Sequence, residues 1–170
     1  MSVRITNRQV LFKILLILVP CALALAGIYR VLQELRYSLE CQNNLRALYH
    51  ALELYEMERG ALPKLSFFPD IPQEDTDSLR VVLESFGSGG SACICPAAPA
   101  SLQELGLTYV WNVRLNGRKL PRGVAREWML VDIQVLSEDV PAPHLGRYHV
   151  LYSDGTVERI RDPLKQLPGL

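Results

Sequence analysis

Cysteine and histidine offer the most versatile chemistry in this chain, which has four cysteines and three histidines. Cys41, Cys93, Cys95 and His144 could together supply four zinc ligands. Structural zinc sites, however, favour cysteine pairs separated by two to four residues, whereas one residue separates Cys93 from Cys95. Cys21 lies within a long apolar run, where a thiol serves as a small apolar filler. We therefore predict no metal site, and the set of three cysteines with His144 is the less favoured alternative.

His144 is the histidine best suited to catalysis, if a nucleophile or a second base lies beside it. His149 follows five residues later, and an odd separation places two residues on opposite faces if the strand reaches back to His144. Asp132 and Asp154 could orient His144, but no Gly-x-Ser-x-Gly, His-Glu-x-x-His or P-loop signature accompanies them. We predict no catalytic residues and no enzyme activity. His144 is expected to hydrogen-bond to backbone at the entry of a hairpin whose turn Asp154 shapes.

Composition argues against several classes of ligand. The 18 basic and 18 acidic side chains cancel, so the net charge gives no reason to expect nucleic acid as a partner. Ser137, Glu138 and Asp139 offer oxygen atoms to calcium, but the aspartate spacing of an EF-hand is missing. We expect no bound cofactor.

The N-terminal region contains an apolar run long enough to cross a bilayer, residues 10–29, VLFKILLILVPCALALAGIY, in which Lys13 is the only charge. At about 1.5 Å per residue, a helix of this length spans the roughly 30 Å hydrocarbon core. Arg4, Arg8 and Lys13 place residues 1–9 in the cytoplasm by the positive-inside rule. Residues 30–170 then form a domain outside the cytoplasm.

Two other interpretations of the same run are weaker. Ala22, Ala24 and Ala26 resemble a signal-peptidase site, and Cys21 could be a lipoprotein cysteine. The apolar run continues past these alanines into a helical pattern without a break, and Pro20 stands where a lipoprotein signal needs a small residue. A retained membrane helix is therefore the preferred interpretation.

The spacing of apolar residues predicts a helix over residues 30–59 that continues the membrane helix. Its apolar positions recur at steps of three, four and seven residues, at Leu32, Leu35, Leu39, Leu45, Leu48, Tyr49, Leu52 and Tyr55. Gly60 and Pro63 supply the stop signal. Asn43 and Asn44 lie inside this helix, where asparagine is unfavourable. They either hydrogen-bond to the sheet or the cysteine loop, or are simply polar surface.

The C-terminal third predicts an antiparallel sheet over residues 107–161. TYVWNV, REWMLVDIQV, RYHVLYS and TVERI are rich in aromatic and β-branched residues. Asp154-Gly155 between the last two predicts a two-residue type I′ hairpin turn. A short helix over residues 78–86 with Asp77 as N-cap precedes them. We predict an α+β fold in which one face of the sheet is buried against the long helix.

These features resemble type IV pilins and type II secretion pseudopilins, and more specifically the pilin-like group ending in a His-(nine residues)-Asp-Gly motif. Four stretches carry the resemblance: CQNNLRALYHALELYEMERGALP, CICP with YVWN, WMLVDI, and HLGRYHVLYSDGTVE. The resemblance implies a pilin-like fold and a disulfide between Cys41 and Cys95, with Cys93 competing for the same partner. It also implies structural roles for its motif residues, which are Asn43, Asn44, Pro96, Asn112, Asp132, His144, Asp154 and Gly155.

The resemblance further implies a membrane-anchored, pilin-like structural or accessory subunit of a type II secretion or type IV pilus-type system. Its setting would be the bacterial cytoplasmic membrane, and its partners the lipid bilayer, other pilin-like subunits or secretion-system membrane proteins. The usual prepilin peptidase signal is missing, since no acidic residue occurs before Glu34. The alternative function is a membrane-tethered extracytoplasmic module that binds a ligand or protein and does not enter a filament.

Overall fold

The computed structural model describes residues 7–123, 126–137 and 139–170, without the side chains of residues 7–11 and 13. Most of the expected cytoplasmic segment 1–9, the Lys13 side chain and Glu138 of the calcium candidate thus lie outside the described part. The chain divides into two compact units, Met1–Arg36 and Tyr37–Leu170, which are described separately below.

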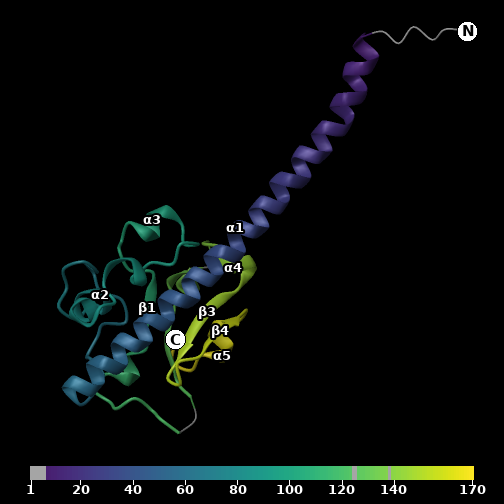
Figure 1. Cartoon of the computed structure of the whole chain (residues 1–170). Coiled ribbons are helices and arrows are strands. Elements are labelled where there is room, and N and C mark those ends of the chain that lie inside the picture. Colours follow the sequence, from purple (N-terminus) through teal and green to yellow (C-terminus); the bar gives the residue numbers. More distant parts are fainter. Residues whose placement is uncertain (1–6, 124–125, 138) are drawn as a thin grey trace, which may run out of the picture. The chain divides into compact units, whose positions relative to one another are not determined.

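Helix α1 runs without interruption from Asn7 to Arg59 and passes through Pro20 (Figure 1). It ends where the sequence predicts. Gly60 adopts a φ of +81° and its N–H donates to the Glu56 carbonyl, which is the usual left-handed close of a helix.

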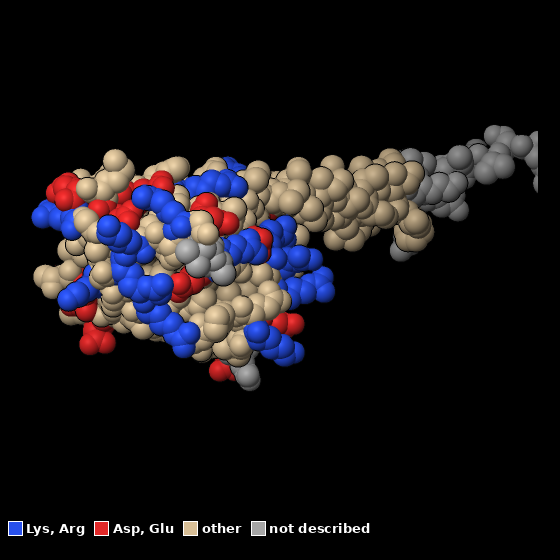
Figure 2. Space-filling model, turned by 90° about the horizontal axis from the view of Figure 1, so that it is seen from below, with Lys and Arg blue, Asp and Glu red and all other residues tan. Residues whose placement is uncertain are grey.

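The described part of the first unit is the N-terminal part of α1, whose side chains from Ile14 to Tyr29 are exposed and uncharged. Among the described residues, α1 is the one helix long and apolar enough to cross a membrane, and none of its most apolar stretch is buried. From Ile14 to Tyr29 the sequence contains no charged residue. Figure 2 shows this stretch as uncharged surface, whereas the domain surface mixes acidic and basic side chains. A single candidate membrane span is consistent with a single-pass membrane protein.

The second unit is built on an antiparallel sheet in which each strand pairs with the next along the chain, in the order β1-β2-β3-β4. Its described strands are β1 Tyr109–Trp111, β2 Trp128–Asp132, β3 Tyr148–Tyr152 and β4 Val157–Ile160. All four fall within the segments that the sequence predicts. Together with α1 they confirm the α+β fold, a long N-terminal helix packed on a small antiparallel sheet.

Both faces of the sheet are buried, which corrects the expectation of one. One face packs on the C-terminal part of α1, in a core that includes Leu45, Leu48, Trp111 and Leu151. The opposite face has its own core. Its members are Val110, Trp128, Val131, Val135, Val150, Ile160 and Leu167. The alternation of side chains along the strands predicts that this second face is exposed to solvent, but the C-terminal segment with Leu167 covers it.

Short helical turns connect these elements. They are α2 Leu79–Leu83, η1 Glu84–Phe86, η2 Gly90–Cys93, α3 Ala100–Gln103, η3 Val113–Leu115, η4 Ile133–Leu136, α4 Pro143–Gly146 and α5 Pro163–Gln166. The predicted helix 78–86 is therefore a turn of α-helix followed by a 3₁₀ turn. Its N-cap is Ser78 rather than Asp77, and the Ser78 side chain makes no capping bond.

The β3–β4 turn is one residue longer than the sequence predicts. The Tyr152 N–H donates to the Thr156 carbonyl and the Gly155 N–H donates to the Tyr152 carbonyl, so Ser153, Asp154 and Gly155 form the loop. Asp154 does not have the positive φ that a type I′ turn requires, whereas Gly155 does, at +80°. Asp154 shapes the turn as expected, because its Oδ1 accepts hydrogen bonds from the Thr156 N–H and hydroxyl.

Gly155 provides a direct test of how closely this turn approaches α1. A Cβ built there would lie 2.9 Å from Tyr49 Cε1, whereas one at Gly60, with almost the same φ, would meet nothing within 4 Å. We expect Gly60→Ala to lower the free energy of unfolding by about 1 kcal/mol, from the positive φ alone. Gly155→Ala should lower it by about 2 to 3 kcal/mol, because it adds overpacking. Urea unfolding of both variants measures the difference, and equal losses would mean that the turn does not press on the helix.

Candidate functional site

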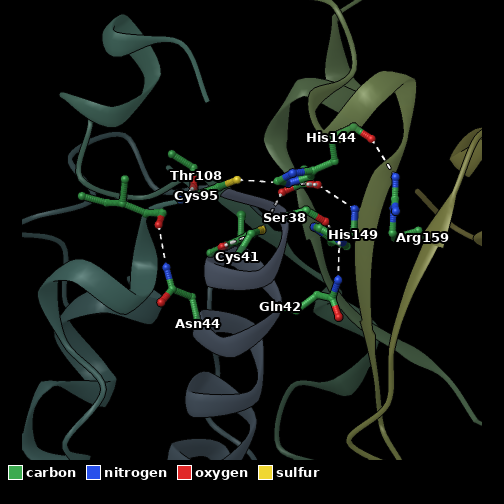
Figure 3. Close-up of polar contacts among 12 residues, drawn as sticks. Ser38, Cys41, Gln42, Asn44, Cys95, Thr108, His144, His149 and Arg159 are labelled. Carbon is green, nitrogen blue, oxygen red and sulfur yellow. Dashed lines mark hydrogen bonds and ion pairs between the residues drawn. The ribbon is translucent and has the colours of Figure 1, made fainter. Parts of the chain in front are cut away.

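A cluster of buried polar side chains lies where α1 meets the sheet. Cys41 on α1, Asp132 at the end of β2, His144 in the α4 turn and His149 on β3 are each no more than 1% exposed. One potential ligand atom from each of the four lies within 4.8 Å of the others. Figure 3 shows Cys41, His144 and His149 converging from separate elements. We call this group the Cys-Asp-His-His cluster.

Cys41 enters the cluster because it lies on the buried face of α1, one turn before Leu45. The Tyr109 hydroxyl lies 3.2 Å from its Sγ, and its thiol donates to Asp132 Oδ1 at 3.7 Å. Burial, contact with Cys95 and the nearby Asp132 raise the pKa of the Cys41 thiol well above its usual value. The sulfur is therefore a neutral thiol unless a cation comes close enough to stabilise the thiolate.

Asp132 is fully buried at the point where β2 gives way to a 3₁₀ turn. Its Oδ2 accepts a 2.7 Å hydrogen bond from the His149 backbone N–H and lies 4.0 Å from His144 Nε2. Burial raises the pKa of Asp132 to about 7, although hydrogen bonds from the His149 N–H and the thiols of Cys41 and Cys95 oppose the rise. A pKa in this range leaves Asp132 protonated in part of the molecules at neutral pH, and a nearby positive charge would favour the ionised form.

His144 is held in the cluster by an unusual backbone turn. His144 and Leu145 have φ of 54° and 61°, the only positive values outside glycine in the described residues. Each such residue costs about 1 kcal/mol or more, and strain of this kind is often retained at functional sites. The Arg159 guanidinium donates to the His144 carbonyl at 3.0 Å and thereby ties the turn to β4.

His149 points into the same space from β3. Its Nε2 lies 3.3 Å from Ser38 Oγ and 3.4 Å from Gln42 Nε2, and its ring centroid lies 4.0 Å from that of His144. The expectation that the two histidines lie on opposite faces required a strand that reaches back to His144, and it does not apply because β3 begins at Tyr148. His144 precedes the strand, and its left-handed turn, to which strand alternation does not apply, brings the imidazole back over the helix-facing side.

Both imidazoles are neutral near pH 7. Burial, helped by Arg159, lowers the pKa of His144 to about 4. Burial, then His144 and two arginines, lowers the pKa of His149 to about 3. Among the described residues neither Nδ1 has a hydrogen-bond partner. Leaving a buried polar nitrogen unpaired costs about 1 to 3 kcal/mol. The cluster therefore contains hydrogen-bonding atoms that lack partners at a cost in stability. The backbone bond predicted for the His144 side chain is also not present; Cys95 Sγ is its 3.2 Å neighbour.

The cysteine loop borders the cluster. The Cys95 N–H donates to Thr108 Oγ1 at 2.6 Å, and Asn44 Nδ2 donates to the Ile94 carbonyl at 2.9 Å (Figure 3). These bonds fix the loop against both the sheet and the helix. Of the two alternatives for the asparagine pair, Asn44 therefore binds the loop, whereas Asn43 is exposed and accepts a hydrogen bond from Arg46.

The predicted disulfide is not present. All four cysteines are free, although the Cys41 and Cys95 side chains are in contact as the resemblance implies. Cys93 does not compete for this partner. Its thiol donates to the Ser88 carbonyl, and burial raises the pKa of the Cys93 thiol to about 12. Of the alternative metal set of three cysteines with His144, only Cys41 and His144 belong to the Cys-Asp-His-His cluster.

The remaining motif residues have structural contacts. Asn112 donates to the Trp128 carbonyl and accepts from the Arg114 N–H, which links β1 to β2. The Pro96 carbonyl accepts a hydrogen bond from Gln103, and Pro96 lines a shallow groove of about 390 Å³ with Asn43 and Asn44.

Sequence reasoning named Asp132 as a carboxylate that could orient His144, but it missed the assembly of both residues with His149 and Cys41. The available signal was the placement of Asp132 and His149 in strands that are otherwise strongly apolar, WMLVD and YHVLY. A buried polar residue in such a strand needs a partner, and the partners come from elsewhere in the chain.

Comparison with known proteins finds no matching protein family, no matching curated protein and no matching solved structure. The function is therefore argued from the geometry of this chain.

The lowered pKa values of the two histidines predict how stability depends on pH. Between about pH 4 and pH 6.5 the unfolded chain protonates both imidazoles, whereas the folded chain keeps them neutral and protonates Asp132 instead. At these three groups the unfolded state therefore binds two protons and the folded state binds one, so unfolding takes up about one proton. These groups together therefore make stability rise with pH by about 1.4 kcal/mol per unit across this window.

His149→Gln removes one of the two histidine contributions. We expect the slope of unfolding free energy against pH to fall by about 1.4 kcal/mol per unit, whatever the variant does to overall stability. Urea unfolding of the reduced full chain in detergent, followed by near-ultraviolet circular dichroism, measures both slopes. Parallel pH profiles for the wild type and the variant would contradict a neutral, buried His149.

Proposed function

We propose that this chain is a membrane-anchored, pilin-like structural or accessory subunit of a secretion or pilus-type system. It acts by lateral packing of its long helix in the bacterial cytoplasmic membrane. The observation that carries the proposal is α1, one 53-residue helix whose N-terminal part is apolar and exposed and whose C-terminal part is the spine of the domain.

The length of the exposed apolar surface on α1 supports assembly. A bilayer covers about 20 residues of helix, which accounts for residues 10–29. Exposed apolar side chains continue beyond that point at Val31, Leu32, Leu35 and Leu39. A bilayer that ends near residue 29 leaves these side chains to water, whereas neighbouring helices of the same kind would cover them.

Charge supports the proposed orientation. Arg4 and Arg8 precede the apolar run and Lys13 lies near its start, which favours an N-terminus in the cytoplasm and a domain outside it. An impermeant maleimide tests this. Lys64 is exposed, so Lys64→Cys in a Cys21→Ser background should be labelled in spheroplasts without permeabilisation, while the buried native thiols stay unlabelled. Labelling that requires permeabilised membranes would reverse the orientation.

The second candidate function is a membrane-tethered extracytoplasmic binding module that stays outside any filament. The missing acidic residue before Glu34 favours it, because a standard filament subunit carries one in the membrane segment. The Cys-Asp-His-His cluster also favours it, because a purely structural domain has no need of such a group of potential ligands.

Thiol cross-linking in native membranes separates the two functions. We expect Leu35→Cys and Leu39→Cys, each in a Cys21→Ser background, to form cross-linked dimers and larger species, because assembly brings these helix surfaces together. Lys64→Cys on the domain surface is the matched control and should give far less product. If Leu35→Cys and Leu39→Cys remain monomeric at native expression, lateral assembly is wrong and the tethered module is favoured.

A further inference from the structure

We propose that Cys41, Asp132, His144 and His149 form a binding site for one divalent transition-metal ion of the zinc class. A bound ion would link α1 to the sheet and to the turn before β3. The inference goes beyond the proposed function and does not depend on it, since either a filament subunit or a tethered module could hold such an ion.

The spacing of the ligand atoms fits a tetrahedral ion. Zinc bonds of about 2.0 to 2.3 Å to nitrogen, oxygen and sulfur separate neighbouring ligand atoms by about 3.3 to 3.8 Å. Cys41 Sγ lies 3.7 Å from Asp132 Oδ1, and His144 Nε2 lies 4.0 Å from Asp132 Oδ2. The whole set lies within 4.8 Å, so side-chain shifts of about an ångström or less complete the geometry.

The chemistry of the donors selects the class of ion. Calcium and magnesium take six or more oxygen ligands, whereas this cluster offers one sulfur, one carboxylate and two imidazoles. Zinc and its neighbours in the first transition row prefer this mixture. A thiolate and a carboxylate together carry two negative charges, so a dication leaves the buried site neutral overall. Burial then costs much less than it would for either ionised group alone.

The cluster also holds imidazole nitrogens whose hydrogen-bonding capacity the protein leaves unused. Each imidazole has a buried nitrogen without a partner in the described part of the chain, and both rings are fully buried. Neutral imidazole is the form that binds metal. When the ion binds, it displaces the thiol proton of Cys41, and any proton on Asp132, to solvent.

Surrounding groups orient the ligands in the way that metal sites require. The Tyr109 hydroxyl contacts the Cys41 sulfur, and the His149 N–H holds one oxygen of Asp132. Ser38 Oγ contacts His149 Nε2, and the strained turn tied by Arg159 aims His144 inward (Figure 3). Such outer contacts fix ligand geometry and affinity.

A disulfide between Cys41 and Cys95 is the competing fate of the thiol in an oxidising compartment. Both side chains are in contact, so oxidation would remove the only sulfur ligand of the set. The test therefore starts from reduced protein, and the state of Cys41 is checked by thiol counting before metal is added.

The experiment uses the full chain in detergent, stripped with a chelator, reduced with a phosphine, equilibrated with Zn²⁺ and desalted before elemental analysis. We expect one zinc per wild-type chain. Cys41→Ser and His149→Gln should each weaken zinc affinity by about a hundredfold or more, since even outer contacts are worth about 10- to 100-fold. Cys93→Ser is the matched control, because it removes an equally buried thiol that bonds to the Ser88 carbonyl, and it should keep its zinc.

Cobalt substitution of the wild type decides the matter even if a variant fails to fold. Co²⁺ in this site should show tetrahedral d–d bands and a thiolate-to-cobalt charge-transfer band, and Zn²⁺ should displace both. The proposal is overturned if reduced wild-type protein retains no zinc, or if Cys41→Ser and His149→Gln retain it as well as Cys93→Ser. It is also overturned if bound cobalt is octahedral without the charge-transfer band.

Discussion

The contact between the C-terminal part of α1 and the sheet is the interaction on which the rest of this domain depends. Leu45, Leu48 and Leu52 are completely buried there against a sheet whose strands are too short to be stable alone. The same contact brings Cys41 to Asp132 and His149, and it seats the β3–β4 turn against Tyr49. Apolar packing at one end of the contact between α1 and the sheet therefore sets the positions of the polar groups at the other end.

Those polar groups are expensive to bury. Asp132 and the two imidazoles contribute no apolar contact comparable to leucine, and the turn that carries His144 is strained. A domain selected only for stability would place apolar side chains at these positions, since such replacements are often neutral or stabilising. The free-energy cost of buried polar groups and of backbone strain is concentrated in this cluster, whereas nearby polar groups such as Asn112 and Asn44 are well hydrogen-bonded. This contrast is the physical reason to assign a ligand to the cluster.

The two compact units face different physical requirements. The apolar part of α1 has no core of its own to pack against and needs a non-aqueous surrounding, either lipid or neighbouring helices. The domain is self-sufficient, with a separate core on each face of its sheet. One continuous helix, α1, contributes residues to both units.

Local patterns in the sequence determined the extent and end of the helix, the existence of all four described strands and the presence of a turn at Asp154-Gly155. Each of these follows from periodicity, β-propensity or the freedom of glycine at positive φ. Only the tertiary structure decided that the rings of His144 and His149 lie against each other, that Cys41 contacts Asp132, and that both sheet faces are covered. The contact of Cys41 with Asp132 joins residues 91 positions apart in the chain, and the approach of His144 to His149 depends on a left-handed turn at His144 that no residue preference predicts. Packing between distant parts of the chain determines these placements, because the close-packed contact between α1 and the sheet leaves room for one arrangement of the side chains.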